Sequence, residues 1–181
     1  MAEFRLETKR LVLREWRDSD LEPLGRMNSD PEVMEFVGPP QTLEQNERLI
    51  ARCKASQAGN GHCYWVIERR SDGAMIGFCG LDLGPAGTPV EGEVEIGWRL
   101  ARDVWGQGFA KEAALASLAW GFANLPVDTI WSKTVPANER SWGLMCRMGM
   151  EYVEGGDFDH PALPEGHRLR RHVLYRINRP Q

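Results

Sequence analysis

The chain has 181 residues, of which 42% are hydrophobic and 27% charged, and its formal net charge is −4. This length and balance are typical of one soluble domain with a complete core, so we expect a single domain over residues 1–181. Non-specific binding of nucleic acid requires an excess of basic residues, and this chain has a net negative charge. No run in the sequence approaches the ~20 consecutive apolar residues of a membrane span. We therefore expect neither nucleic acid nor membrane as a partner.

The N-terminus and the cysteines favour a cytoplasmic location. Met1 is not followed by a basic start and an apolar run, so we expect no secretion signal. The four cysteines form no C-x-x-C pair and have no metal-ligand spacing. We expect reduced thiols that act as small hydrophobic residues, and no bound metal.

The hydrophobic pattern predicts strands and helices in one continuous unit. Runs rich in β-formers or alternating in hydrophobicity lie at 10–16, 64–69, 74–83, 93–100, 128–135, 152–154 and 168–177. Apolar residues at helical spacing lie at about 21–27, 31–36, 43–57, 110–122 and 138–148. With neither repeat nor linker between these elements, the pattern is typical of one α+β domain with a mostly antiparallel sheet.

Three local signals place the elements in chain order. Asp18, Ser19 and Asp20 offer N-cap residues for the first helix, and Thr42 with Gln45 has the spacing of a capping box for the long one. Ser71-Asp72-Gly73 then predicts a hairpin between the strands at 64–69 and 74–83. At Ala110 the hydrophobic period changes from that of a strand to that of a helix.

The segment from 93 to 110 predicts an anion site. A strand at 93–100 is followed by the turn Trp105-Gly106-Gln107-Gly108-Phe109-Ala110 and then by a helix. Glycines let the backbone approach a ligand closely, and a helix start offers unpaired N–H groups and partial positive charge. A Walker A loop would need Gly-Lys-Ser/Thr here, and a dinucleotide fingerprint would need three glycines early in a βαβ unit. Taken by itself, the turn leaves a purely structural role open.

Three ordered motifs resemble those of the GNAT acetyltransferases. The glycine turn is similar to their pyrophosphate motif, R/Q-x-x-G-x-G/A, with Trp105 in place of Arg or Gln. Glu93-Val-Glu-Ile-Gly-Trp followed by Trp105-Gly-Gln-Gly-Phe-Ala-Lys-Glu-Ala resembles the RimJ/RimL-like branch, the ribosomal-protein alanine N-acetyltransferases. The helix beginning Asn138-Glu-Arg-Ser141 and ending at Gly149, and the opening strand Arg10-Leu-Val-Leu-Arg14, agree with that branch.

The resemblance implies a fold and an activity. The fold would be a GNAT fold, with a mixed, mostly antiparallel sheet of about seven strands, flanked by about four helices and splayed between the fourth and fifth strands. The activity would be transfer of an acetyl group from acetyl-CoA to a primary amine by direct attack. A non-catalytic acyl-CoA-binding or sensing module is the alternative. The acceptor, a protein N-terminus or a small molecule, stays open, as does the choice between monomer and homodimer.

The resemblance also assigns the coenzyme site. The residues implied to bind acetyl-CoA are Trp98, Leu100, Trp105, Gly106, Gln107, Gly108, Phe109, Ala110, Asn138 and Ser141. Lys111, Arg140 and Arg147 are candidate partners for the 3′-phosphate, although each also fits an ordinary solvated helix charge.

Two residues are implied to be catalytic. Glu95 would be the base that deprotonates the amine, with Glu93 as second choice, and a bulge in this strand would aim residues of both faces at one cleft. Ser141 would protonate the leaving thiolate, because Met145 stands where many members have a tyrosine; a hydroxyl bonded to its own helix backbone is an equal alternative. The thiolate could also leave unassisted.

The acceptor side is the least defined from sequence. Residues 155–167 could select a cationic amine or form a structured loop without a ligand. Residues 168–172 are more typical of an exposed strand face than of a phosphate site. The resemblance implies that one of Trp16, Met34 and Phe36 faces the acceptor.

Overall fold

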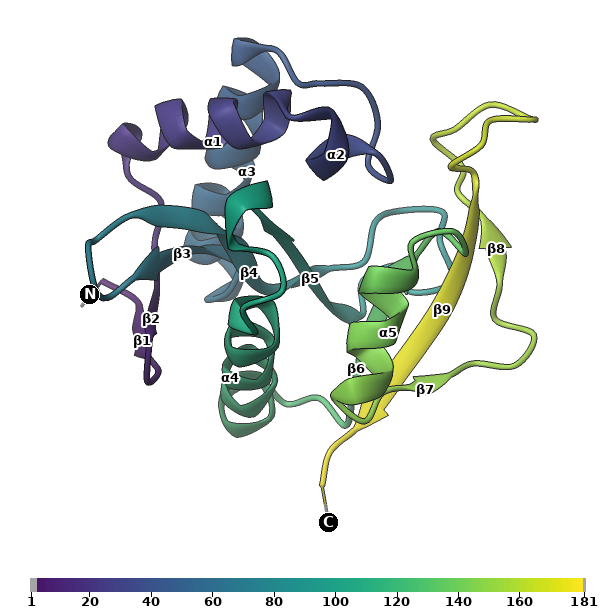
Figure 1. The fold of residues 1–181 in the computed structure, drawn as a ribbon. Helices are drawn as coiled ribbons and strands as arrows, with labels where there is room; N and C mark the ends of the chain where they lie inside the picture. Colours follow the sequence, from purple (N-terminus) through teal and green to yellow (C-terminus); the bar gives the residue numbers. More distant parts are fainter. Residues whose placement is uncertain (1–2, 181) are drawn as a thin grey trace.

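The computed structural model describes residues 3–180 as helices on both faces of one twisted sheet (Figure 1). Its strands are β1 (Arg5–Glu7), β2 (Leu11–Arg14), β3 (Tyr64–Arg69), β4 (Met75–Leu83), β5 (Val94–Leu100), β6 (Thr129–Thr134), β7 (Glu151–Tyr152), β8 (Phe158–Asp159) and β9 (Arg171–Asn178). The order across the sheet is β1-β2-β3-β4-β5-β6-β9-β7, with β8 pairing β9. All pairings are antiparallel except that of β5 with β6.

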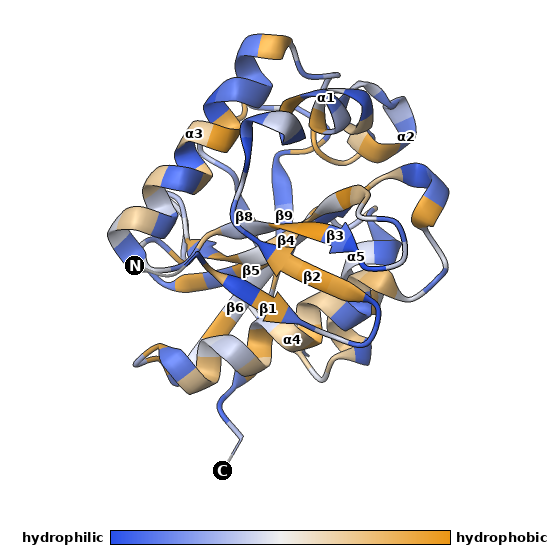
Figure 2. Ribbon diagram, turned by 90° about the vertical axis from the view of Figure 1, so that its left-hand side faces the viewer, coloured by the Kyte–Doolittle hydropathy of each residue, from blue (hydrophilic) through white to orange (hydrophobic). Residues whose placement is uncertain are grey.

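The helices divide between the two faces of the sheet. They are α1 (Leu21–Ser29), α2 (Pro31–Met34), α3 (Leu43–Asn60), α4 (Phe109–Asn124) and α5 (Glu139–Arg147), with short 3₁₀ turns η1 (Asp18–Asp20) and η2 (Arg102–Val104). Figures 1 and 2 both place α1, α2 and α3 on one side of β3–β5 and α4 on the other. In Figure 2 the hydrophobic colour gathers on strands such as β2 and β3, between the helical layers. None of the helices in residues 3–180 combines the length and the hydropathy required to cross a bilayer.

The α+β fold class and the mixed, mostly antiparallel sheet predicted from sequence are confirmed. The number of strands was underestimated, because β1 and β8 are three and two residues long and too short to give a periodic signal. The last strand begins at Arg171 rather than at residue 168, because the preceding backbone turns: the N–H of Arg170 donates to the carbonyl of His167 at 2.9 Å.

The register of β4 against β5 decides which face each β5 side chain occupies. Cys79 lies opposite Trp98, and its Sγ is 3.8 Å from Oγ of Ser117 in α4, so Trp98 lies on the α4 face. Side chains alternate along a strand, which puts Glu95, Gly97 and Arg99 on the face of α1–α3. Arg99 accordingly donates to Oδ1 of Asn28 in α1 at 2.8 Å. Side chains on the two faces of β5 therefore point toward α4 on one side and toward α1–α3 on the other.

The predicted splay is present between β5 and β6, which are the strands predicted at 93–100 and 128–135. The two strands share a single register pair, Glu95 with Trp131, whereas β4 and β5 pair over seven residues. Beyond that pair a side chain replaces the backbone hydrogen bond: the Ser132 hydroxyl donates to the carbonyl of Ile96 at 3.0 Å. Leu100 likewise uses its carbonyl to accept from the Trp105 indole at 2.9 Å. The backbone edge of β5 is thus open from Ile96 onward.

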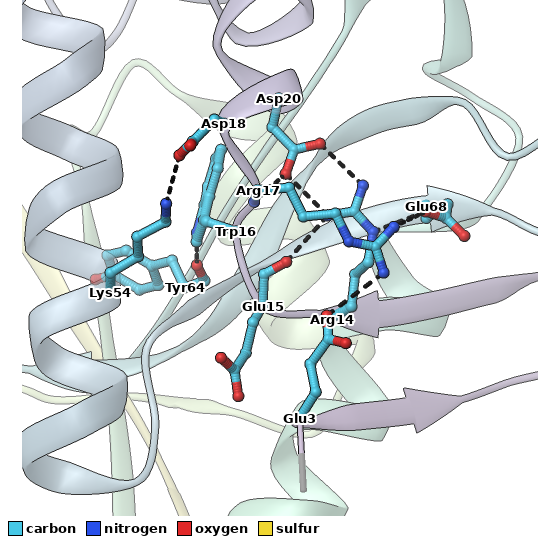
Figure 3. Close-up of polar contacts among 10 residues, drawn as sticks. All are labelled: Glu3, Arg14, Glu15, Trp16, Arg17, Asp18, Asp20, Lys54, Tyr64 and Glu68. Carbon is cyan, nitrogen blue, oxygen red and sulfur yellow. Dashed lines mark hydrogen bonds and ion pairs between the residues drawn. The ribbon is translucent and has the colours of Figure 1, made fainter.

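A buried ion network fixes the first helix to the sheet (Figure 3). The Arg14 guanidinium donates to both carboxylate oxygens of Asp20, at 2.8 and 2.9 Å, and to Glu68 on β3 at 2.7 Å. The predicted N-cap role of Asp20 is wrong in detail: its side chain makes no cap bond to α1 and accepts from the backbone N–H of Arg17 instead, at 2.7 Å. Paired at both ends, the Arg14 charge is compensated away from water.

Removing Asp20 tests the weight of this network. We expect Asp20→Ala to lower the free energy of unfolding by about 3 kcal/mol, because a buried arginine loses its bidentate partner. Urea denaturation of the two proteins measures the difference. Glu22→Ala, which breaks an exposed ion pair with Arg26 on the same helix, is the matched control and should change stability little. Equal small losses in both variants would contradict the role given to Arg14.

Candidate active site

The glycine turn adopts the conformation that the sequence predicts for an anion cradle. Gly106 and Gly108 have φ of +76° and +81°, a left-handed region that side chains rarely adopt. Gly108 is the N-cap of α4, so the first N–H groups of that helix point out of its start without helical partners. The fit to a phosphate is therefore built from backbone, with the helix dipole behind it.

Arg10 and Glu112 hold this turn from the side of β2. Glu112 accepts from the Arg10 backbone N–H at 2.8 Å, from its guanidinium at 2.7 Å and from the Thr8 hydroxyl at 2.7 Å. Arg10 in turn donates to the carbonyl of Gln107 at 2.9 Å and lies 4.3 Å over the Phe109 ring. Partial burial of Glu112 opposes its charge, but these donors prevail and lower its pKa. The first turn of α4 and the glycine turn are thereby fixed to one another.

A cavity of about 700 Å³ opens beside the glycine turn. Of the residues implied to bind the coenzyme, those lining it are Trp98, Leu100, Trp105, Gly106, Gly108, Phe109, Ala110, Asn138 and Ser141. Gln107 differs: it is exposed, its carbonyl faces Arg10, and its amide donates to the carbonyl of Asp103 at 3.1 Å. The other nine residues thus surround one cavity, whereas the Gln107 side chain lies outside its wall.

The three candidate cations, Lys111, Arg140 and Arg147, all line this cavity. Arg140 is already engaged, because it pairs with Glu35 at 3.3 Å and lies 4.4 Å over the Trp105 ring. Arg102 lies on the same indole at 4.9 Å and pairs with Glu32 of α2 at 2.7 Å. Trp105 thus anchors two arginines at the rim, each tied to a carboxylate from the α2 region.

A second cavity, of about 400 Å³, adjoins the first on the α1–α3 side of β5. Its polar wall is formed by Tyr64, Glu95, Arg99, Lys133, His160 and His172. The two cavities share Phe36, Val37, Trp98, Arg99, Asn138 and Ser141. They therefore meet at the opening between β5 and β6, where the sheet has no backbone pairing.

Glu95 is buried at 7% exposure and held by two partners. The Tyr64 hydroxyl donates to Oε1 at 2.8 Å, and the Lys133 ammonium pairs with Oε2. Burial first, and then the adjacent carboxylate, hold the pKa of Tyr64 well above its ordinary value, so its hydroxyl stays a donor. Glu93, the second choice for the base, is exposed in the loop before β5.

The bulge expected in the β5 strand is not found. Its register with β4 runs unbroken from Val94 to Leu100. Residues of both faces reach one space by another route, because the opening between β5 and β6 joins the cavities of the two sides. Trp98 from one face and Arg99 from the other therefore line both cavities without any distortion of the strand.

The start of α5 brings Asn138 and Ser141 to the junction of the cavities. Asn138 caps the helix, accepting from the Ser141 N–H at 3.3 Å, and donates to the Thr134 hydroxyl at 3.1 Å. The Ser141 hydroxyl makes no hydrogen bond to another residue within 3–180, unlike Ser117, whose hydroxyl bonds to the Ala113 carbonyl of its own helix. Met145, at 1% exposure, belongs to the core.

Two histidines from the C-terminal part complete the second cavity. The rings of His160 and His172 have centroids 5.2 Å apart, and Phe158 stacks on His172 at 5.4 Å. Burial lowers the pKa of both histidines, with the Lys133 charge adding to the effect, so both are neutral at pH 7. The interpretation of 168–172 as an exposed face is wrong for His172, which is half-buried and lines the cavity.

Sequence reasoning missed Tyr64, Lys133 and the position of Arg99 in this cavity. Tyr64 and Lys133 lie on strands that gave no motif, and the parity of Arg99 with Glu95 was the one available signal. Of the three residues offered for the acceptor side, Phe36 lines both cavities. Trp16 and Met34 are buried at 4% and 1% exposure, in the core.

Comparisons with known proteins agree with this geometry. Residues 10–151 match the family model of the acetyltransferase (GNAT) domain. The uncharacterized N-acetyltransferase p20 of Bacillus licheniformis is 32% identical over 149 residues, 81% of this chain and 82% of that protein. The crystal structure of an acetyltransferase from Agrobacterium tumefaciens str. C58 superposes with a TM-score of 0.80 at 27% identity, covering 99% of this chain and 96% of that one.

The chain therefore belongs to the GNAT acetyltransferase family, whose members use acetyl-CoA. A ribosomal-protein-S5-alanine acetyltransferase from Vibrio fischeri superposes with a TM-score of 0.73 over 98% of this chain and 97% of that one. At 16% identity this likeness is one of fold alone. The comparisons thus give the family, and the branch rests on the motifs.

The Arg10–Glu112 contact yields a prediction for coenzyme binding. We expect Glu112→Ala to raise the Kd for coenzyme A about 10-fold, because the glycine turn loses its fixed position while every residue of the cavity wall remains. Isothermal titration calorimetry measures the Kd. Glu44→Ala, which removes an exposed carboxylate paired with Arg48, is the control and should leave it unchanged. An unaltered Kd in Glu112→Ala would refute the positioning role.

The buried histidines yield a prediction for pH. An unfolded histidine has a pKa near ~6.5, and the folded value of His172 is lower, so the unfolded chain binds more protons between the two values. The free energy of unfolding should therefore fall as pH drops through this window and be flat above it for this group. Urea denaturation from pH 7.5 down to 5.5 should show a smaller loss in His172→Asn than in the parent. Parallel curves would contradict the assignment.

Proposed function

We propose that the protein transfers the acetyl group of acetyl-CoA to a primary amine, by direct attack of the amine on the thioester. The observation that carries the proposal is the meeting of two cavities at Trp98 and Ser141. One lies beside the glycine turn at the start of α4, and the other holds a buried carboxylate. A thioester entering from the first and an amine entering from the second would meet at the opening between β5 and β6.

Glu95 is the proposed base. An amine is mostly protonated at neutral pH, so a nearby group has to accept a proton before the nitrogen can attack. Tyr64 and Lys133 orient the Glu95 carboxylate, which could accept the proton directly or through one water. Its 7% exposure leaves it reachable from the second cavity, which it lines.

The backbone of Trp98 is the proposed donor to the oxyanion. The carbonyls of Ile96 and Leu100 both point into the opening, since they accept from Ser132 and Trp105. N–H and carbonyl groups repeat every second residue along a strand, so those of Trp98 point the same way. An N–H at this place can stabilise the charge that develops on the acetyl oxygen.

Ser141 is the proposed donor to the leaving thiolate. Its hydroxyl is free of its own helix and lies where both cavities meet. Coenzyme thiolate is also a fair leaving group, because a thiol pKa lies near ~8.5, so this proton matters less than that of the amine. Met145 does not argue for the non-catalytic alternative, since its side chain is packed in the core rather than aimed at the cavity.

The finer assignments rest on the motifs and are proposals of the same kind. They are membership of the RimJ/RimL-like branch, one functional domain over 1–181 and a cytoplasmic location with acetyl-CoA as soluble co-substrate. The free thiols of the four cysteines are consistent with that location.

Replacing Glu95 tests the mechanism. We expect Glu95→Gln to lower kcat by about 10²- to 10⁴-fold, the range for loss of a general base, with the Kd for coenzyme A unchanged. Glu93→Gln is the matched control two residues away and should keep the parental rate. Steady-state kinetics with acetyl-CoA and any accepted amine give both values.

The outcomes separate the candidate roles. An unchanged rate in Glu95→Gln would remove this residue from the mechanism, and a loss in Glu93→Gln would transfer the role to that residue. Coenzyme binding without transfer to peptide N-termini, polyamines, aminoglycosides or amino acids would favour the non-catalytic alternative.

A further inference from the structure

Arg99 is a half-buried cation without an anionic partner among residues 3–180. Its side chain extends from β5 toward α1, where it donates to Oδ1 of Asn28 at 2.8 Å and lies 5.1 Å over the Phe78 ring. Both contacts are with uncharged groups, and within residues 3–180 no carboxylate lies within ion-pair distance of the guanidinium. Burial lowers the pKa of Arg99 to about 10, which still leaves it charged at neutral pH.

Burying such a charge is costly unless something compensates it. Buried ions in proteins are paired or hydrogen-bonded, and arginine fits carboxylates best because its planar fork can donate two parallel bonds. Arg14 shows what this chain does with a buried arginine that serves structure, since Asp20 and Glu68 surround it. Arg99 instead lines both cavities, and its charge is accessible to a ligand in the second one.

We propose that the acceptor is a small amine that also carries a carboxylate, an amino acid in the chemical sense, and that Arg99 binds that carboxylate. This inference rests on the proposed acetyl transfer at the same site. Glu95 and Arg99 are four residues apart on one face of β5, about 13 Å along the strand, with Gly97 between them. The Tyr64 ring lies over Gly97, where a Cβ would be 3.1 Å from its Cε1. A molecule in the second cavity would therefore lie beside this ring, with its amine toward Glu95 and its carboxylate toward Arg99.

The remaining charges of the cavity agree with an anionic group on the acceptor. The one carboxylate among the described residues of its wall, Glu95, is already neutralised by Lys133. His160 and His172 are neutral at pH 7, as their lowered pKa values require. The cavity therefore carries about one net positive charge, which disfavours a polyamine and favours a molecule with a compensating negative group.

Arg99 lines the larger cavity as well as the second one. Its contacts with Asn28 and Phe78 direct the guanidinium toward the α1–α3 face of β5. Lys111 and Arg147 also line the larger cavity and form no ion pair among residues 3–180, so they remain the candidates for the coenzyme phosphates.

The test compares amines that differ only in the carboxylate. The panel is phenylalanine, leucine, glutamine and lysine, each with its carboxamide and its decarboxylated amine, and spermidine as a polycation. With acetyl-CoA, kcat/KM should be about 10- to 100-fold higher for at least one amino acid than for its two matched derivatives, the range for one charge-assisted pair. Equal or higher values for the derivatives that lack the carboxylate or for spermidine would overturn the inference while leaving acetyl transfer intact.

Variants assign the selection to Arg99. We expect Arg99→Gln to abolish the preference for the carboxylate, so that the ratio of kcat/KM for an amino acid to that for its carboxamide falls to about 1. Arg52→Gln removes the same charge from exposed α3, where it still acts on Arg99 through space, and should keep the preference. A rise in the Kd for coenzyme A in Arg99→Gln, with acceptor preference unchanged, would place the residue on the coenzyme and overturn the proposal.

A binding measurement separates this inference from the proposed activity. The N-acetyl forms of the four amino acids and of their carboxamides are titrated into the protein saturated with coenzyme A. Tighter binding of an N-acetyl acid than of its carboxamide, lost in Arg99→Gln, would support the carboxylate site even if no amine were acetylated. Equal binding of both forms in the parent protein would count against it whatever the turnover.

Discussion

The parting of β5 from β6 is the constraint around which the rest of the molecule is arranged. A central sheet normally satisfies its own backbone groups, and an open edge inside a protein is costly unless other groups occupy it. Here the two strands keep one register pair at Glu95 and Trp131, and then side chains of Ser132 and Trp105 take two of the freed carbonyls. The backbone N–H and carbonyl of Trp98 lie between these two carbonyls, at the centre of the opening. The fold thus leaves one short piece of the β5 edge without backbone partners from β6.

Keeping such an opening requires firm support on either side, and β2 supplies much of it. Arg10 directly precedes β2, and Arg14 is the last residue of that strand. Arg10, with Glu112, holds the glycine turn and the first turn of α4. Arg14, with Asp20 and Glu68, holds the start of α1, the helix that carries Asn28 to Arg99. Two ion networks, one at each end of β2, therefore support the two cavities, one on each face of the sheet.

The parts predicted from sequence are those specified by local chemistry. Gly106 and Gly108 were identifiable because a left-handed turn before a helix has few alternatives to glycine, and Asn138 because it begins a helix with the spacing of a known motif. The splay came from the resemblance, since no local pattern encodes it. Lys133, Tyr64 and Arg99 became neighbours only through the pairing of strands distant in sequence. The bulge was wrongly expected because alternation alone cannot show that an opening in the sheet joins the spaces on its two faces.

Arg14 and Arg99 differ in how the protein compensates their charges. Arg14 has a complete set of anionic partners and gains nothing from contact with a ligand. Arg99 is held in place by neutral groups, an amide and an aromatic ring, which fix its direction without cancelling its charge. Glu95 stands between these cases, because Lys133 balances its charge while Tyr64 orients it. Lys133 already balances the charge of Glu95, so Glu95 does not need Arg99 as an ion-pair partner. One cavity can therefore hold both a base for the amine and a cation for a second group on the same molecule.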